Sequence, residues 1–353
     1  YNLPHPNDNI GNNGDPNQQI VMNNLLKTKL NLSSFRNTGF VQISREIGNL
    51  TINGGTRASY WTFNDDFFMS PRFSFAYAPL WKKDIIFRAS SGIYYQSPFY
   101  KELRTPEGKL NKNIKAQKST HFVLASDYLF FSWGRPFKWI TEVYYKKLEN
   151  LIPYKVDNVQ IQYLSNDLSN GYASGIDMKI NGEFVNGIES WASLSIMKTE
   201  EDLVGDFKIN NDGSRSEIGY IPRPTDQRVN FSMFFQDYIP GNPNYKMHLN
   251  LLYGTGLSFG PPNGERYEDI LRIPDYRRVD IGFSAVLKSK EHQSKLKILN
   301  KFESIWISAE IFNLLDINNT VSYLWVADIS GRQYAVPNYL TSRQINTKLI
   351  LTF

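Results

Sequence analysis

The 353-residue sequence contains no cysteine, which excludes disulfide bonds, thiolate metal sites and cysteine nucleophiles. It also has no apolar run near the ~18 residues of a membrane-spanning helix, since runs such as Tyr323–Ala327 are far shorter. The four histidines include no pair at metal-ligand spacing, and no catalytic serine motif or phosphate-binding glycine loop is present. The net charge of +5 is spread along the chain, without the basic cluster typical of nucleic-acid binding. We therefore expect no enzyme activity, no cofactor, no metal site and no nucleic-acid partner.

Aromatic residues are abundant, whereas the sequence as a whole is not very hydrophobic. Phe, Trp and Tyr make up 14% of the residues, yet all hydrophobic residues together reach only 41%. The mean hydropathy is accordingly low, at −0.41. A membrane β-barrel has this composition because only every second strand residue must be apolar, and aromatics collect at the two membrane interfaces.

From Gly39 onward the sequence alternates between apolar and polar residues in short segments. The clearest examples are Tyr245–Leu251, Val229–Phe235 and Val279–Ala285. Alternation at period two gives a strand one apolar and one polar face. The pattern predicts about thirteen strands, at 39–46, 49–60, 71–79, 84–95, 118–130, 137–149, 172–183, 188–198, 227–238, 245–256, 276–288, 303–314 and 342–353.

The connections between these strands alternate in length. Short ones follow the odd-numbered strands, for example 131–136 and 239–244, although 289–302 is long for a turn. The longer ones follow the even-numbered strands, at 61–70 (modest for its class), 96–117, 150–171, 199–226, 257–275 and 315–341. Outer-membrane barrels have short periplasmic turns and long extracellular loops, whereas a soluble sandwich has no reason to sort its loops in this way.

The loop parity predicts orientation and domain organisation. Phe353 should lie at the periplasmic side, and the Asn/Gly-rich segment 1–38 should be an extracellular loop before the barrel portion 39–353. An alternative for the Asn/Asp residues of segment 1–38 is calcium binding, but the 12-residue spacing of a known calcium loop is missing. Single-chain bacterial barrels have even strand numbers, so thirteen strands suggest that the chain is a fragment.

Several local motifs resemble one family. The terminal segment Gln344–Phe353 is similar to the strand by which outer-membrane proteins are recognised for insertion, with Phe353 as its signal. Other motifs resemble recurrent strand and loop sequences of TonB-dependent outer-membrane receptors, at Ser70–Tyr77, Pro222–Arg228, Pro274–Asp280, Phe312–Asp316 and Val336–Arg343. The last of these is similar to the branch with an N-terminal carboxypeptidase-regulatory-like domain. Leu315 departs from the family motif, which has Phe there.

The resemblance covers residues 39–353 and implies an all-β fold, the last 13 strands of a 22-stranded transmembrane barrel in the bacterial outer membrane. A plug domain, the first strands and the TonB box would lie in sequence outside this chain. The implied function is TonB-dependent import of a siderophore, vitamin, glycan or peptide. The implied partners are the lipid bilayer with lipopolysaccharide, the plug and first strands, the TonB complex and a surface lipoprotein.

Three alternatives remain open at this point. The first is a passive porin-type channel, for which no plug domain is needed. The second is a structural barrel that scaffolds a larger outer-membrane complex. The third is a soluble β-sandwich, which would be extracted without detergent.

Two groups of side chains are candidates for function. Polar residues on predicted lumen-facing positions should form a hydrogen-bonded network, comprising Arg57, Arg72, Arg88, Asp127, Glu142, Asp177, Arg228, His248, Asp280 and Glu310. Aromatic and arginine residues in or beside the predicted outer loops are candidates for ligand contact, although membrane-interface or loop packing is the alternative for each. They are Tyr163, Tyr220, Arg223, Tyr267, Arg272, Tyr323, Trp325, Arg332 and Tyr334.

Overall fold

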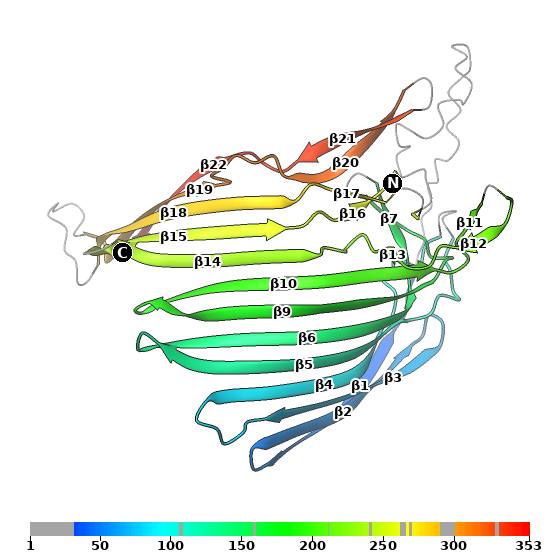
Figure 1. Cartoon of the computed structure of the whole chain (residues 1–353), viewed down its shortest axis with the longest axis horizontal. Helices are drawn as coiled ribbons and strands as arrows, with labels where there is room; N and C mark the ends of the chain where they lie inside the picture. Colours follow the sequence, from blue (N-terminus) through cyan, green and yellow to red (C-terminus); the bar gives the residue numbers. More distant parts are fainter. Residues whose placement is uncertain are drawn as a thin grey trace.

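The chain forms one large, curved antiparallel sheet in a computed structural model (Figure 1). The structure describes residues 32–105, 109–157, 160–210, 212–239, 242–261, 266–267, 270–289, 301–328 and 332–353. Its main path contains β1 (Arg36–Ile47), β2 (Leu50–Trp61), β3 (Asp66–Tyr77), β4 (Asp84–Gln96), β5 (Gln117–Ser132), β6 (Arg135–Leu151), β9 (Ser169–Val185), β10 (Ile188–Leu203), β14 (Val229–Ile239), β15 (Asn242–Gly254), β18 (Tyr276–Lys288), β19 (Ser304–Phe312) and β22 (Gln344–Thr352).

These strands confirm the predicted all-β fold class and the thirteen predicted strands. Each strand pairs with the next one on the path, so the sheet is a continuous meander. Several predicted boundaries were wrong, by up to five residues, including the ends of β3 and β10. The segment 61–70 is not a loop, because β2 and β3 continue to Trp61 and from Asp66 and leave only 62–65 as a turn. The predicted loop 1–38 falls mostly on residues 1–31, outside the described ones, and β1 already begins at Arg36.

The pairing register sorts the side chains onto two faces. Ala125 on β5 lies opposite Arg88 on β4 and Glu142 on β6, and Glu142 lies opposite Asp177 on β9. Because directly paired residues point to the same side of a sheet, these charged residues share one face, which we call the polar face. Following the register through all thirteen strands places the ten predicted lumen residues on this face.

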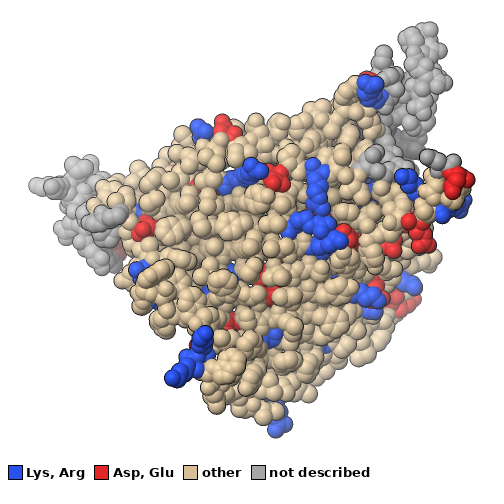
Figure 2. Space-filling view, in the orientation of Figure 1, with Lys and Arg blue, Asp and Glu red and all other residues tan. Residues whose placement is uncertain are grey.

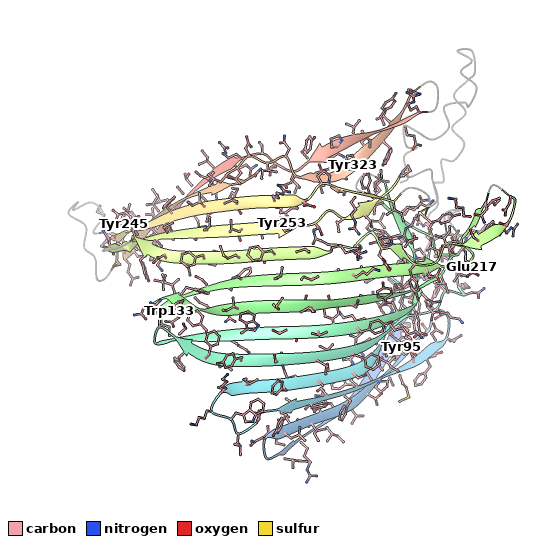
Figure 3. All side chains as sticks on the ribbon, in the orientation of Figure 1. Tyr95, Trp133, Glu217, Tyr245, Tyr253 and Tyr323 are labelled. Carbon is pink, nitrogen blue, oxygen red and sulfur yellow. The ribbon has the colours of Figure 1, made fainter. Side chains whose placement is uncertain are left out.

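The other face, which we call the apolar face, carries large hydrophobic side chains that are exposed. They include Phe73, Phe75, Phe87, Phe122, Leu124, Val143, Ile176, Ile196, Phe283, Ile307 and Leu349. On the side shown in Figure 2, charged side chains are sparse on the sheet wall, and acidic and basic ones gather toward the loop end. Aromatics of the apolar face stand at both strand ends, since Tyr245 lies at the short-turn end of β15 and Tyr253 at its loop end (Figure 3).

The short turns are tight, as the loop parity predicts. Trp133 and Gly134 alone connect β5 to β6, and both have positive φ angles, of 52° and 72°. This is the conformation of a type I′ turn, whose twist matches that of the flanking strands. The described C-terminal residue, Phe353, lies at this same end of the sheet (Figure 1). The predicted turn 289–302 falls largely outside the described residues.

The long connections lie together at the opposite end of the sheet, which we call the loop end (Figure 1). They contain short strands that the sequence pattern does not predict. These are β7 (Tyr154–Asp157), β8 (Gln160–Tyr163), β11 (Phe207–Ile209), β12 (Arg215–Glu217), β13 (Ile221–Pro222), β16 (Ser258–Phe259), β17 (Leu271–Arg272), β20 (Thr320–Ala327) and β21 (Gln333–Tyr339). Except for β13, which extends the pairing of β10, they form separate two-stranded hairpins.

A hydrophobic core also lies at the loop end, where Trp61, Leu103, Ile114 and Ile152 pack together. Two long connections and the end of β2 contribute to it, so the core holds loops against the strand ends. No helix in the described part of the chain is long and apolar enough to span a membrane.

Candidate ligand-binding site

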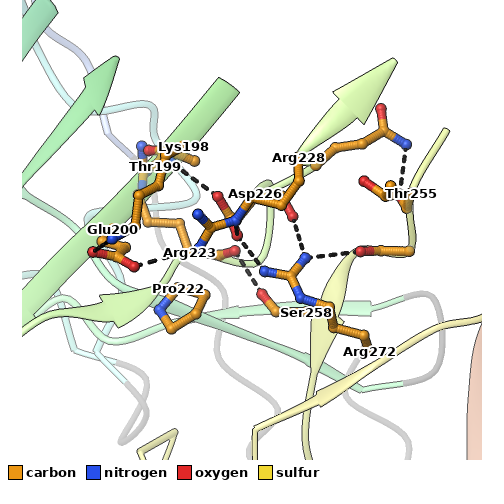
Figure 4. Close-up of polar contacts among 12 residues, drawn as sticks. Lys198, Thr199, Glu200, Pro222, Arg223, Asp226, Arg228, Thr255, Ser258 and Arg272 are labelled. Atoms are coloured by element: carbon orange, nitrogen blue, oxygen red, sulfur yellow. Dashed lines mark hydrogen bonds and ion pairs between the residues drawn. The ribbon is translucent and has the colours of Figure 1, made fainter. Parts of the chain in front are cut away.

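Two fully buried carboxylates organise the loop end. Asp226 lies in the segment between β13 and β14, and it accepts hydrogen bonds from the Thr199 backbone N–H at 2.8 Å and from Arg228 Nε at 2.7 Å. Arg272 of β17 forms a further ion pair with the same carboxylate (Figure 4). Since a buried charge is tolerated only when it is paired and hydrogen-bonded, Asp226 holds β17 close to the end of β10.

Glu201 of β10 is the second buried carboxylate. It accepts a hydrogen bond from the Ser169 hydroxyl at 2.7 Å and from Arg266 Nη1 at 2.5 Å. Arg223 Nε lies 3.8 Å from it. Because Arg266 belongs to the connection between β15 and β18, the pair fixes that connection over the strand end.

Backbone groups complete this network. Arg272 Nη1 donates to the carbonyl oxygens of Asp226 and Gly256, both at 2.9 Å, and the Ser258 hydroxyl donates to the Arg223 carbonyl at 2.6 Å. Segment 204–228 and segment 255–275 are therefore joined through several bonds rather than one (Figure 4).

A small pocket with a volume of about 50 Å³ lies beside the ion cluster. Its wall combines Tyr154 and Lys155 of β7, Pro222 of β13, Phe259 of β16 and the Arg266 side chain. Burial raises the pKa of the Tyr154 phenol, which therefore stays a neutral hydroxyl. Apolar walls with a few polar groups are the common chemistry of small-molecule sites.

An aromatic stack connects the pocket to the hairpin of β20 and β21. The Phe259 and Tyr323 rings stack at 4.6 Å between centroids with an interplanar angle of 10°, and Trp325 lies 6.2 Å from Phe259. Trp325 is 8% exposed, so this stack is packed rather than open.

Replacing Phe259 with alanine is expected to weaken the attachment of the β20–β21 hairpin by about 1–2 kcal/mol, from lost stacking and apolar contact. Faster amide hydrogen exchange in β20 would report it. Tyr334→Ala on the same hairpin is the matched control, because its ring is 48% exposed and should leave exchange in β20 unchanged. Equal effects of the two substitutions would contradict the role of the stack.

The structure separates the predicted ligand residues into several groups. Arg223 and Arg272 belong to the ion cluster, whereas Tyr323 and Trp325 form the stack. Tyr163 packs against the hydrophobic core. Tyr220, Tyr334 and Arg332 are exposed, and Tyr267 lies in the same connection as Arg266. Their role in binding a ligand stays a prediction.

Most predicted lumen residues do form polar contacts. Arg88 lies 2.6 Å from Asp127 and 3.5 Å from Glu142, while His248 Nε2 lies 3.5 Å from Glu310. Asp280 binds Arg278 at 2.7 Å and accepts the Asn313 backbone N–H at 2.9 Å. Arg228 pairs instead with Glu200 and Asp226 of the ion cluster. Arg57, Arg72 and Asp177 have no ion pair within the described residues.

Sequence reasoning missed Glu201, Asp226, Ser169, Phe259 and Tyr154 as members of the site. Asp226 stands inside the motif Pro222–Arg228, which marked it as part of a strand start but not as a buried charge. Glu201, Ser169, Phe259 and Tyr154 belong to no sequence motif that would have marked them as members of a site.

No protein-family model and no curated protein sequence matches the chain. Solved structures do match. The outer membrane transporter YddB from Escherichia coli superposes with a TM-score of 0.63 at 12% identity, covering 90% of this chain and 45% of that one. The copper transporter OprC gives 0.59 at 14% identity, covering 90% and 47%. The FrpB iron transporter from Neisseria meningitidis gives 0.57 at 11% identity, covering 90% and 45%.

The chain has the barrel fold of TonB-dependent outer-membrane receptors. This agrees with the family that the sequence motifs resemble and confirms the predicted barrel fold. The chain spans less than half the length of these three receptors. At these identities the likeness concerns the fold, and the roles of the loop-end pocket and of the polar face are not shown by it.

Proposed function

We propose that the chain forms the C-terminal part of the wall of a TonB-dependent importer in the bacterial outer membrane. The observation that carries this proposal is the division of one TonB-receptor-type sheet into an exposed apolar face and a charged polar face. Exposing a single large apolar side chain to water costs roughly 1.5–3 kcal/mol. A face carrying many of them, such as Phe122, Leu124 and Ile176, is stable only against lipid or another apolar surface.

The polar face would line the barrel interior. A barrel of this family is too wide for side chains to fill its interior, so that space must hold water or a plug. We propose that a plug and the first strands of the same receptor complete the structure, with TonB acting through that other part. Lipid and lipopolysaccharide would surround the apolar face, and a surface lipoprotein would contact the loop end.

The cargo would be a nutrient captured at the loop end. FrpB is described as an iron transporter, Fiu as a ferric-catecholate import receptor and OprC as a copper transporter. The small pocket and the exposed Tyr220, Arg332 and Tyr334 offer aromatic and cationic contacts for part of such a solute. A siderophore, vitamin, glycan or peptide all fit this chemistry, because fold does not specify cargo.

Uptake measurements test the proposal. Cells that lack the full-length gene are expected to lose import of the cargo, with ferric catecholates and copper as the first probes. Import by wild-type cells should stop when the proton-motive force is collapsed, because TonB-coupled transport needs that energy.

Uptake that continues without the proton-motive force, together with a steady ion conductance in planar bilayers, would instead establish a passive channel. Unchanged nutrient uptake in the deletion strain, with loss of a larger surface complex, would establish a scaffold.

A further inference from the structure

A row of cationic side chains crosses the polar face near the loop end. The register pairs Arg72 of β3 with Gly92 of β4, Gly92 with His121 of β5, and His121 with Lys146 of β6. Arg57 of β2 is the diagonal neighbour of Arg72, since Arg57 pairs with Ser70. Positive groups thus occupy β2, β3 and β6 on one surface.

This row differs from the rest of the polar face in lacking carboxylates. Other cations of this face do have acidic partners, as where Arg88 and Lys138 both contact Asp127, at 2.6 Å and 2.9 Å. Among the described residues, neither Arg57 nor Arg72 has an acidic partner. The Arg72 guanidinium lies 4.5 Å from the Tyr94 ring centroid, a cation–π contact that leaves its N–H edge free to donate.

The two arginines also share a hollow. Its volume is about 470 Å³, and its wall includes both arginines together with polar side chains of the neighbouring strands, Gln42, Asn53, Ser74 and Ser90. Gly92 leaves room for this arrangement, because a Cβ there would lie 3.2 Å from both Arg72 Cγ and Tyr94 Cε2. Free guanidinium groups, neutral donors and open space therefore coincide.

We propose that this hollow binds an anionic solute carrying two phosphate or carboxylate groups. Guanidinium groups hold such oxygens through paired, charge-assisted hydrogen bonds. Diagonal neighbours across two antiparallel strands stand about 7–8 Å apart, so Arg57 and Arg72 each engage one anionic group. The inference rests on the proposed uptake function, in which solute passes along the polar face.

Pyrophosphate binding to the full-length protein in detergent tests the site. Isothermal titration calorimetry at low salt is expected to show binding that weakens as salt is added. The double change Arg57→Gln and Arg72→Gln should weaken it by about tenfold or more, since one lost charge-assisted bond is worth roughly that factor. Arg45→Gln is the matched control, because Arg45 is exposed on the opposite face of β1 and should leave the affinity unchanged.

Two results would overturn the site. The first is a pyrophosphate affinity that is unchanged in the double variant. The second is a wild-type protein that binds no pyrophosphate, together with a lower melting temperature of the double variant. The second result would mean that the arginines hold an acidic segment of the receptor itself. Arginine-dependent binding in a protein that imports nothing would support the site and overturn only the uptake function. Energy-dependent import by a protein that binds no anion would support the uptake function and overturn the site.

Discussion

Replacing Asp226 with asparagine is expected to destabilise the loop end by about 2–3 kcal/mol. The substitution keeps the shape of the side chain but removes the charge that Arg228 and Arg272 share. Breaking a fully buried pair costs ~3–5 kcal/mol, but both arginine side chains are 36% exposed and water screens part of the loss. Urea unfolding in lipid vesicles measures the stability, and limited proteolysis shows whether segment 255–275 opens first.

The matched control is Asp212→Asn in the tip between β11 and β12. Its carboxylate is exposed and bonds only locally, to the backbone N–H and the hydroxyl of Ser214. We expect no measurable change in global stability and no new cleavage near Arg272. If Asp226→Asn resembles this control, the ion cluster does not hold the connections together.

The fold was largely predictable because each strand shows its two faces in its own short stretch of sequence. In Tyr245–Leu251, alternating residues meet two different environments, so period two remains visible in the sequence. Prediction was wrong at β3, where the consecutive apolar residues Phe67, Phe68 and Met69 hide the alternation. The two- to four-residue strands of the loops, such as β7 and β16, are too short to carry any period.

The candidate site was less predictable, for a different physical reason. Glu201 and Arg266 are 65 residues apart in the chain. They meet only because the end of β10 and the connection that follows β15 lie side by side at the loop end. Nothing in the residues beside Glu201 indicates that it is buried. The sequence pattern did place ten polar residues on one face, because the alternation along each strand decides which face a side chain takes. It does not decide which of these side chains pair.

Replacing Leu124 with lysine is expected to impair membrane assembly more than any single change on the polar face. Leu124 lies mid-way along β5 on the apolar face and is 65% exposed, so in the proposed barrel it contacts lipid near the bilayer centre. A lysine there costs about 2–4 kcal/mol in a membrane barrel, because its charge must leave water or distort the bilayer. Heat-modifiable mobility on gels and the yield of full-length protein in outer-membrane fractions measure assembly.

Ala125→Lys, the next residue along the chain, is the matched control. It has the same strand position and gains the same charge, but it lies on the polar face between Glu142 and Arg88. Glu142 offers the new ammonium group a partner, and water on this face screens its repulsion from Arg88. Assembly of this variant should stay near that of the wild type. A soluble sheet with two solvated faces would tolerate both lysines, and a sandwich packed through its polar face would reject Ala125→Lys more strongly. Only a barrel in lipid makes the leucine position the sensitive one, so the difference between two adjacent residues decides which face meets the membrane.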